Sequence, residues 1–279
     1  MQPLAPSALW KIATPSPSWR LPGVAMAGFR ARGPADLGVV PFPAVTLAID
    51  LGAEPLLVTD GGREVRGSAV VGLSRGGPQG GLRGAGRDVQ CLQVRLSPVV
   101  AHAVLGGFAV EGGPLAGLDE VWGRDAARWE ERLRAAASWE ERFALVAGAL
   151  AARRTEGRPV DPEVAYVWAE LARSHGTSRV DALAAEVGWS RKRLWSRFRS
   201  QVGLGPKQAA RLVRFDHAAH RLAAGGHPAA VAAETGYADQ SHLHREVADF
   251  AGLTPSAVAR EPWLSVDGVA WSAPGYLHN

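Results

Sequence analysis

Cysteine is almost absent from this chain of 279 residues, which contains only Cys91. A single cysteine cannot form a disulfide within the chain and cannot build a metal site that needs several thiolates. Histidine is also scarce in the first half, where His102 is the only one before His175. A barrel-type metal site needs a His-x-His pair with a later Glu and His. We therefore expect neither a metal site nor a cofactor.

Long apolar runs are missing as well. No stretch approaches 18 apolar residues, the length that a membrane-spanning helix needs. Residues 1–30 lack a basic segment followed by an apolar core, so we expect no signal peptide. With 47% hydrophobic and 21% charged residues, the composition is that of a globular protein with room for two domains. We expect a cytoplasmic protein without a membrane partner.

Acidic residues are outnumbered in one segment. Residues 173–260 contain 13 Arg and Lys against 7 Asp and Glu, whereas the rest of the chain contains 18 against 20. A basic excess confined to one segment is typical of a surface that meets phosphates. A merely solvated basic surface is the alternative, but it does not explain why the excess coincides with a repeat in the same segment.

This repeat has a spacing of 48 to 49 residues. Residues 182–189 are echoed by 230–237, and the Gly-x-x-Pro exit at 203–206 is echoed at 252–255. Each copy predicts a short Ala-rich helix, a turn at a Gly followed by an aromatic residue, and a second helix with one polar face. This is the pattern of a helix-turn-helix, whose second helix lies in the DNA major groove.

The pattern predicts an all-helical region after a polar linker at 156–162. We expect its helices at 163–174, 180–187, 190–202, 206–224, 228–235, 239–251 and 255–260. The long helix at 206–224 carries an apolar stripe broad enough to hold both helix-turn-helix modules.

Before the linker, the sequence predicts short strands and a small barrel or sandwich. We expect these strands at 45–51, 55–59, 68–73 and 89–96, with a tight turn at 60–62. In the last strand the alternation predicts that Leu92, Val94 and Leu96 point inward and that Gln93 and Arg95 point outward.

Four further segments complete the expectations. Residues 1–30 are interpreted as an extended arm, and the glycine-rich stretch 76–86 as a loop, because it fits no phosphate-binding motif. A helix at 99–105 and a helical pair at 124–154 are expected. The apolar stripes of this pair favour a homodimer.

The helical region resembles the C-terminal DNA-binding domain of the AraC/XylS family of transcription regulators. The resemblance rests on Leu-Ala-x-Glu-x-Gly-Trp-Ser-x-x-x-Leu-x-x-x-Phe at 183–198 and on Ala-Ala-Glu-Thr-Gly-Tyr-x-Asp-Gln-Ser-His-Leu-x-Arg at 232–245. Two positions depart from the family pattern. Val247 stands where Phe is usual, which predicts looser packing of the second module, and Ser196 stands where Arg is frequent.

The resemblance implies an α+β protein of two domains. Residues 1–155 would be a β-rich sensory and dimerisation domain, a small barrel or sandwich with helices. Residues 163–261 would be an all-α domain of seven helices, in which one long helix joins two helix-turn-helix units. Outside the resemblance, residues 262–279, with Trp271 and Tyr276, are interpreted as a tail that docks back on a domain.

The resemblance also assigns residues that face DNA. On the first recognition helix they are Lys192, Trp195, Ser196 and Arg199, which recur at three- and four-residue spacing and so share one face. Lys and Arg can donate to guanine, and Trp195 can contact a thymine methyl or a sugar. The flanking Arg191 and Arg193 are interpreted as phosphate contacts rather than base contacts.

On the second recognition helix the outward residues are Gln240, Ser241, His244 and Arg245. Gln240 suits adenine, and Arg245 suits guanine or a phosphate. Asp239, Glu246 and Asp249 of this helix nearly cancel its positive charge, which predicts that the first module supplies most of the affinity. The pair of histidines at 242 and 244 is interpreted as ordinary surface residues rather than as a zinc site.

Three functions remain open at this point. The first is a transcription regulator, activator or repressor, that binds promoter DNA and responds to a small-molecule effector. The second is a DNA-binding regulator without an effector, controlled by a protein partner or by its abundance; RNA polymerase is a candidate partner of either. The third is an alkylation-repair protein that accepts a methyl group on Cys91. This residue lacks the expected Pro-Cys-His context, so we expect no catalytic residue and no enzyme.

Overall fold

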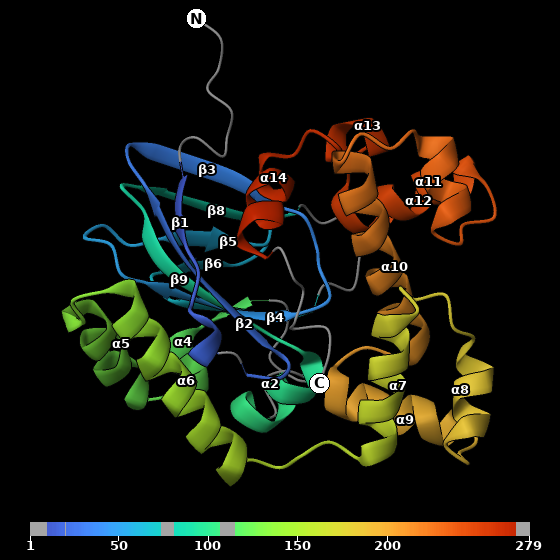
Figure 1. Cartoon of the computed structure of the whole chain (residues 1–279), viewed down its shortest axis with the longest axis horizontal. Helices are drawn as coiled ribbons and strands as arrows, with labels where there is room; N and C mark the ends of the chain where they lie inside the picture. Colours follow the sequence, from blue (N-terminus) through green and yellow to red (C-terminus); the bar gives the residue numbers. More distant parts are fainter. Residues whose placement is uncertain (1–9, 20, 74–80, 107–114, 272–279) are drawn as a thin grey trace, which may run out of the picture.

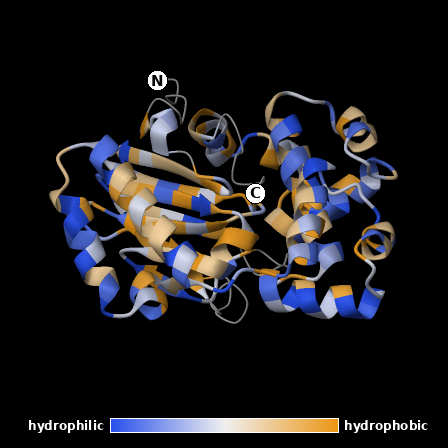
Figure 2. Ribbon diagram, turned by 60° about the horizontal axis from the view of Figure 1, so that its bottom comes forward, coloured by the Kyte–Doolittle hydropathy of each residue, from blue (hydrophilic) through white to orange (hydrophobic). Residues whose placement is uncertain are grey.

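The structure is a computed structural model that describes residues 10–19, 21–73, 81–106 and 115–271. A β-rich N-terminal region is followed by a helical C-terminal region, which confirms the predicted fold class (Figure 1). Hydrophobic residues concentrate on the strands and on the inner sides of the helices, and hydrophilic residues on the outer helices (Figure 2). Within the described ranges, no helix is both long and apolar enough to cross a membrane.

Two antiparallel sheets form the β-rich region. The larger sheet has the order β1 (Trp10–Ala13), β2 (Val24–Ala31), β9 (Gln90–Leu96), β4 (Val45–Asp50), β7 (Ala69–Val71) and β10 (Leu115–Gly117). The smaller sheet has the order β3 (Pro34–Val39), β8 (Leu82–Arg87), β5 (Leu57–Thr59) and β6 (Glu64–Arg66). The two sheets face each other across an apolar interior.

The strands that the sequence predicted are present as β4, β5, β7 and β9, and the turn at 60–62 joins β5 to β6. Two other expectations were wrong. Part of the supposed arm is β1 and β2, which pair with each other in the larger sheet. The supposed loop lies partly outside the described residues, at 76–80, but its end is strand β8, paired with both β3 and β5.

The expected outward orientation of Gln93 and Arg95 was also wrong, since Gln93 lines the interior between the sheets. Leu92, Val94 and Leu96 are buried as predicted, but Arg95 on the opposite face of β9 is 0% exposed. Alternation of apolar and polar residues indicates a strand with one wet face. Here the polar face is covered by a helix from the far end of the chain, whose Asp267 forms an ion pair with Arg95.

Helices cover the outer face of the larger sheet (Figure 1). They are α2 (Pro98–Leu105), α4 (Leu118–Trp122), α5 (Asp125–Ala135) and α6 (Trp139–Glu156). Trp139 lies so close to β2 that a Cβ atom added to Gly28 would collide with its ring. The apolar stripes of α5 and α6 are covered inside the chain, since Leu133, Phe143 and Leu150 are all buried. They therefore give no argument for a homodimer.

The helical region contains seven helices over the stretch that the family resemblance covers. They are α7 (Pro162–Arg173), α8 (Val180–Glu186), α9 (Arg191–Val202), α10 (Pro206–Ala223), α11 (Pro228–Glu234), α12 (Gln240–Ala251) and α13 (Pro255–Val258). The long helix α10 contacts α7, α9, α11, α12 and α13 and so supports both modules. Its predicted apolar stripe is buried, including Leu212, Phe215 and Ala219.

One more helix, α14 (Pro262–Ala270), follows this region and packs on β1 and β3 of the β-rich region as well as on α10. The predicted tail is thus a helix over 262–270, while Tyr276 and the other residues after 271 lie outside the described ranges. Trp263 of α14 stacks on Phe42, with ring centroids 6.2 Å apart. The boundaries proposed at 155 and 163 remain predictions, although α6 ends at Glu156 and α7 begins at Pro162.

Candidate DNA interface

Local signals in the sequence fix the first recognition helix, α9. The hydroxyl of Ser190 caps its N-terminus by accepting a hydrogen bond from the backbone N–H of Arg193 at 3.2 Å. Gly203 ends it in the left-handed conformation, at a φ of 88°. Leu194 and Phe198 are fully buried and attach the helix to its module. These anchors decide which face of α9 points outward.

The outward face of α9 carries the four residues that the family resemblance assigns to DNA. Lys192, Trp195, Ser196 and Arg199 are all exposed. Trp195 is 53% exposed, although a large aromatic ring is seldom left in water without a partner. The guanidinium of Arg199 lies 5.4 Å from its ring centroid. The structure therefore brings a cation and an apolar ring together on this face.

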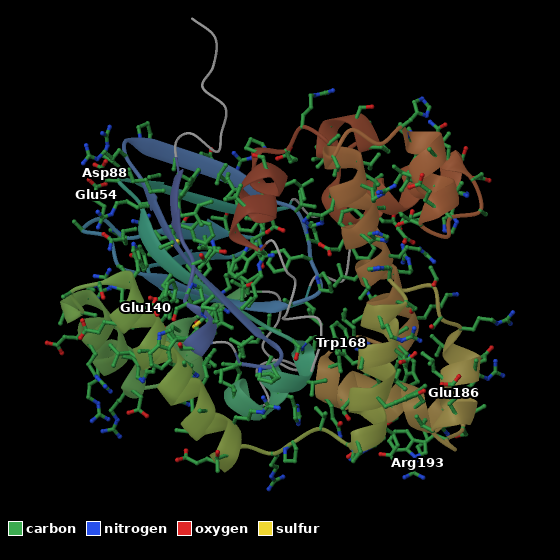
Figure 3. All side chains as sticks on the ribbon, viewed as in Figure 1. Glu54, Asp88, Glu140, Trp168, Glu186 and Arg193 are labelled. Carbon is green, nitrogen blue, oxygen red and sulfur yellow. The ribbon has the colours of Figure 1, made fainter. Side chains whose placement is uncertain are left out.

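The arginines that flank this face have other partners. Arg197 donates two hydrogen bonds to the carboxylate of Asp161, at 2.6 and 2.7 Å, and thereby ties α9 to the start of α7. Arg191 lies 3.5 Å from the carboxylate of Asp181. The guanidinium of Arg193 lies 4.5 Å above the ring of Trp189. Arg193 also lies at the outer edge of its module, away from the β-rich region (Figure 3).

The second recognition helix, α12, is built in the same way. The carboxylate of Asp239 caps it by accepting a hydrogen bond from the backbone N–H of His242 at 2.7 Å. Leu243 and Val247 are fully buried, so Val247 is a well-covered core residue despite its smaller size. The four residues predicted to face DNA are exposed, namely Gln240, Ser241, His244 and Arg245.

Glu246 does not lie on the outward face, contrary to its use in the charge argument for α12. It is 3% exposed and accepts hydrogen bonds from Arg211 at 2.8 Å and from Arg214 at 3.0 Å, both on α10. The hydroxyl of Tyr237 donates to it at 3.0 Å. Burial, followed by the charge of Glu246, raises the pKa of Tyr237. This cluster locks α12 onto α10.

From the sequence, no role was assigned to Arg211 and Arg214, so this cluster was missed. Asp249 also pairs with Arg211, at 2.9 Å, and Asp239 is occupied in the helix cap. The three acidic residues of α12 therefore have structural partners and do not neutralise its outward face. One signal was available in the sequence. Arg211 and Arg214 lie one turn apart on the same helix, and the second module contains acidic residues that could pair with them.

His242 and His244 both lie near the start of α12. Among the residues that the structure describes, no group of three or more His, Cys, Asp or Glu side chains could hold a metal ion. His242 instead contacts the ring of Tyr237 edge-on, with centroids 5.1 Å apart.

Cys91 lies on β9 in the apolar interior and is 3% exposed. Burial, followed by the nearby charge of Asp50, raises the pKa of its thiol to about 12. A thiol that stays protonated and covered is a poor nucleophile.

We therefore expect Cys91 in the folded protein to resist both a methyl phosphotriester and a disulfide reagent at pH 8. Its modification rate should rise at least about 100-fold in denaturant, because unfolding exposes the thiol and restores its ordinary pKa. Mass spectrometry of the intact chain gives this rate. Rapid methylation of the native protein would instead favour the repair function.

The comparisons with known proteins support a helix-turn-helix domain in the helical region. Residues 183–261 match the family described as a helix-turn-helix domain. No curated protein matches the chain. Among solved structures, the chain is similar to ToxT from Vibrio cholerae O395, with 10% identity and a TM-score of 0.47 over 85% of this chain and 97% of that chain.

Two other solved structures are also similar. ToxT from Vibrio cholerae strain SCE256, solved with an unsaturated fatty acid bound, has 11% identity and a TM-score of 0.43 over 85% of this chain and 94% of that chain. The AraC-like transcriptional activator CuxR has 14% identity and a TM-score of 0.29 over 72% of this chain and 83% of that chain. These likenesses are too distant to assign a ligand to this chain.

Proposed function

We propose that the chain is an AraC-type DNA-binding transcription regulator in which α9 and α12 each read a segment of promoter DNA. The match of residues 183–261 to a helix-turn-helix domain supports this proposal. The observation that supports this proposal is the shared design of the two helices. Each is capped at its start, anchored by buried apolar residues, and exposed along a polar face that includes Arg199 on α9 and Arg245 on α12.

The joining helix α10 sets the distance between the two recognition helices. It is 18 residues long, which corresponds to about 27 Å at 1.5 Å per residue. The modules lie around its two ends (Figure 1). Two helices held in this way suit successive major-groove segments on one side of a duplex, about one helical turn apart.

Selection of bound duplexes from a random pool with the full chain tests this proposal. We expect a two-part site whose halves are centred about 10 base pairs apart. Binding should weaken steeply with salt, because several phosphates are contacted and counterions are released. Recovery of a single short element, or of no sequence preference, would contradict the use of two recognition helices.

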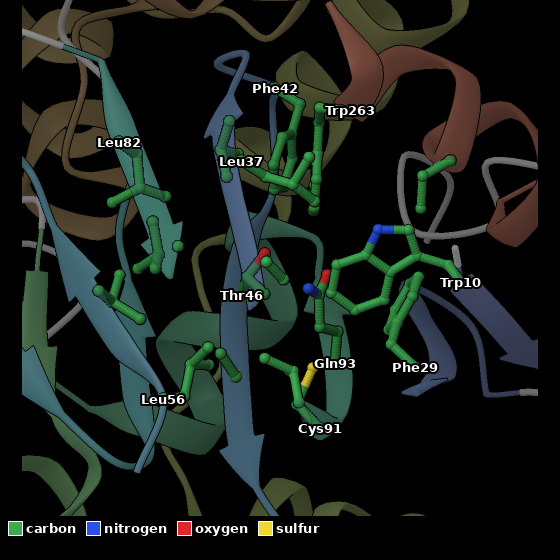
Figure 4. A pocket seen from close by; sticks show the side chains of 18 residues that line it. Trp10, Phe29, Leu37, Phe42, Thr46, Leu56, Leu82, Cys91, Gln93 and Trp263 are labelled. Carbon is green, nitrogen blue, oxygen red and sulfur yellow. The ribbon is translucent and has the colours of Figure 1, made fainter. Parts of the chain in front are cut away.

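We further propose that the β-rich region binds a small-molecule effector between its sheets. Residues of this region, together with Trp263 and Val266 of α14, line an apolar cavity (Figure 4). A concave, mostly apolar space with a few polar groups is the usual form of a small-molecule site. A regulator controlled only by its abundance or by a protein partner would not need this space. RNA polymerase remains a predicted partner.

A further inference from the structure

We propose that the cavity between the sheets binds an uncharged, largely cyclic apolar molecule with one hydrogen-bond donor, and that α14 transmits its binding to α10. This inference rests on the proposed function, because it takes the bound molecule as the effector. It goes further in naming the chemical class of the molecule and the helix that responds to it.

The shape and walls of the cavity favour a cyclic apolar molecule. The empty space is about 720 Å³, counting the part that opens to solvent. Four aromatic side chains contribute to the walls, and they come from β1, β2, the segment after β3, and α14: Trp10, Phe29, Phe42 and Trp263. Figure 4 shows these rings around one end of the space. Aromatic walls pack well against flat rings.

The absence of charge in the lining excludes an ionised ligand. None of the described lining residues is Lys, Arg, His, Asp or Glu. The thiol of Cys91 is also neutral, because burial raises its pKa to about 12. A carboxylate placed here would lose its hydration without gaining a counter-charge, which is strongly unfavourable. Arg95 lies nearby, but Asp267 already balances its charge.

Two polar atoms of the lining can accept a hydrogen bond from a ligand, and the amide oxygen of Gln93 can only accept. The hydroxyl oxygen of Thr46 and the amide oxygen of Gln93 are buried, and neither has a hydrogen-bond partner among the described residues. Thr46 is 5% exposed, and both side chains point into the cavity (Figure 4). In the β4–β9 register Thr46 faces Arg95 and Ala48 faces Gln93, so the two polar groups are diagonal neighbours on one face. A ligand hydroxyl would satisfy an acceptor that is otherwise left unpaired.

Helix α14 forms one wall of the cavity. Trp263 and Val266 line it, and Trp263 is also the residue that stacks on Phe42. A ligand that enters between these rings must push against α14. The first step of the transmission is therefore direct contact between the ligand and α14.

An ion pair also links α14 to α10. Asp267, which follows Val266, pairs with buried Arg95 on β9 and with Nε2 of His220 on α10 at 2.9 Å. Burial alone would lower the pKa of His220, but the carboxylates of Asp216 and Asp267 outweigh it and raise that pKa to about 9. His220 is therefore charged at neutral pH. Both DNA-binding modules pack on α10. A shift of α14 would therefore move the helix that holds the two modules in place.

The ligand class can be tested with three probes of one skeleton and the full chain, since α14 supplies part of the site. 4-tert-Butylphenol is neutral and donates, 4-tert-butylanisole is neutral and does not donate, and 4-tert-butylbenzoate is an anion. By calorimetry at pH 7 we expect the phenol to bind at least tenfold tighter than the other two. Equal binding of all three, or no binding of the phenol at 1 mM, would overturn the proposal.

Three variants test whether the phenol binds in this cavity. Thr46→Val should weaken binding of the phenol about tenfold and of the anisole less, because the phenol can donate to the Thr46 oxygen whereas the anisole can only accept from its hydroxyl. Gly84→Leu should abolish binding of both, since Gly84 lines the cavity and a Cβ there meets nothing within 4 Å. Gly148 on α6 is equally open but lies outside the cavity, so Gly148→Leu is the matched control and should bind normally. Unaltered binding by the Gly84 variant would place the ligand elsewhere.

The transmission is tested by DNA affinity with and without the phenol. We expect the phenol to change the dissociation constant for the selected duplex at least threefold in the natural chain. In His220→Leu the phenol should still bind, but the change in DNA affinity should fall below 1.5-fold. The same change in both proteins would overturn the role of α14.

Hydrogen exchange gives a second measurement that needs no variant, with altered protection of α14 and α10 expected when the phenol binds. Unaltered protection of both helices would also count against the transmission. The two proposals fail separately. Phenol binding without sequence-specific DNA binding would contradict the proposed function, whereas specific DNA binding without phenol binding would contradict only this inference.

Discussion

Replacing Asp267 with alanine should lower the free energy of unfolding by about 3 to 5 kcal/mol, the usual effect of leaving a buried charge without its partner. Arg95 is 0% exposed, and its guanidinium lies between Phe42, at 3.8 Å from the ring centroid, and Trp271, at 4.4 Å. Without Asp267 this cation would stay buried between the two rings after losing the carboxylate that pairs with it. Chemical denaturation of the full chain measures the loss.

Two controls separate this explanation from a general loss of packing. Asp36 pairs with Arg83 on the surface, where both side chains are more than half exposed, so Asp36→Ala should change the free energy of unfolding by less than about 1 kcal/mol. The double variant with Arg95→Met and Asp267→Leu should recover part of the lost stability, because it removes the Arg95 charge together with its partner and leaves only His220 without Asp267. A double variant as unstable as the single one would show that the ion pair is not the cause.

Replacing Lys192 or Arg199 with alanine should weaken binding to the selected duplex about 10- to 100-fold, corresponding to about 1 to 3 kcal/mol for a good base contact. Both side chains are exposed on the outward face of α9, where nothing in the described structure competes strongly for their charge. Alanine at Gln240 or His244 should have a smaller effect, because neither variant removes the fixed positive charge that Lys192 and Arg199 carry. Gel shifts at fixed salt measure the ranking.

Arg197 is the matched control on the same helix. It is the same type of residue as Arg199, but its guanidinium is held by two hydrogen bonds to Asp161. Arg197→Ala should weaken DNA binding less than about threefold. If Lys192 contacts a phosphate, its replacement should also reduce the slope of affinity against salt by about one, without relaxing sequence preference. Larger losses at Gln240 and His244 than at Lys192 and Arg199 would reverse the assignment of the modules.

The helical region could be predicted nearly residue by residue because its signals are local. Ser190 and Asp239 cap their helices through hydrogen bonds three residues away, and Gly203 and Gly252 end them in the left-handed conformation. Such caps stand in the sequence beside the helix that they limit. The expected ends therefore fall within one or two residues of the observed ones.

The β-rich region could be predicted only in part because its decisive contacts are distant in the sequence. Strand β8 is rich in glycine and has no strand signal of its own, but it pairs with β3 and β5 on either side. Arg95 looked like a solvent-facing residue because its partner Asp267 is 172 residues away. Glu246 was misplaced for the same reason, since its partners lie on α10.

The position of α14 has a consequence for how the protein is made. Synthesis runs from the N-terminus, and domains generally begin to fold as they emerge. Here the counter-charge for Arg95 and one side of the interior lie in the last helix that the structure describes. The first region to leave the ribosome therefore completes its folding only after the DNA-binding region has been synthesised, so a nascent chain stalled before residue 262 would carry an unfinished sandwich.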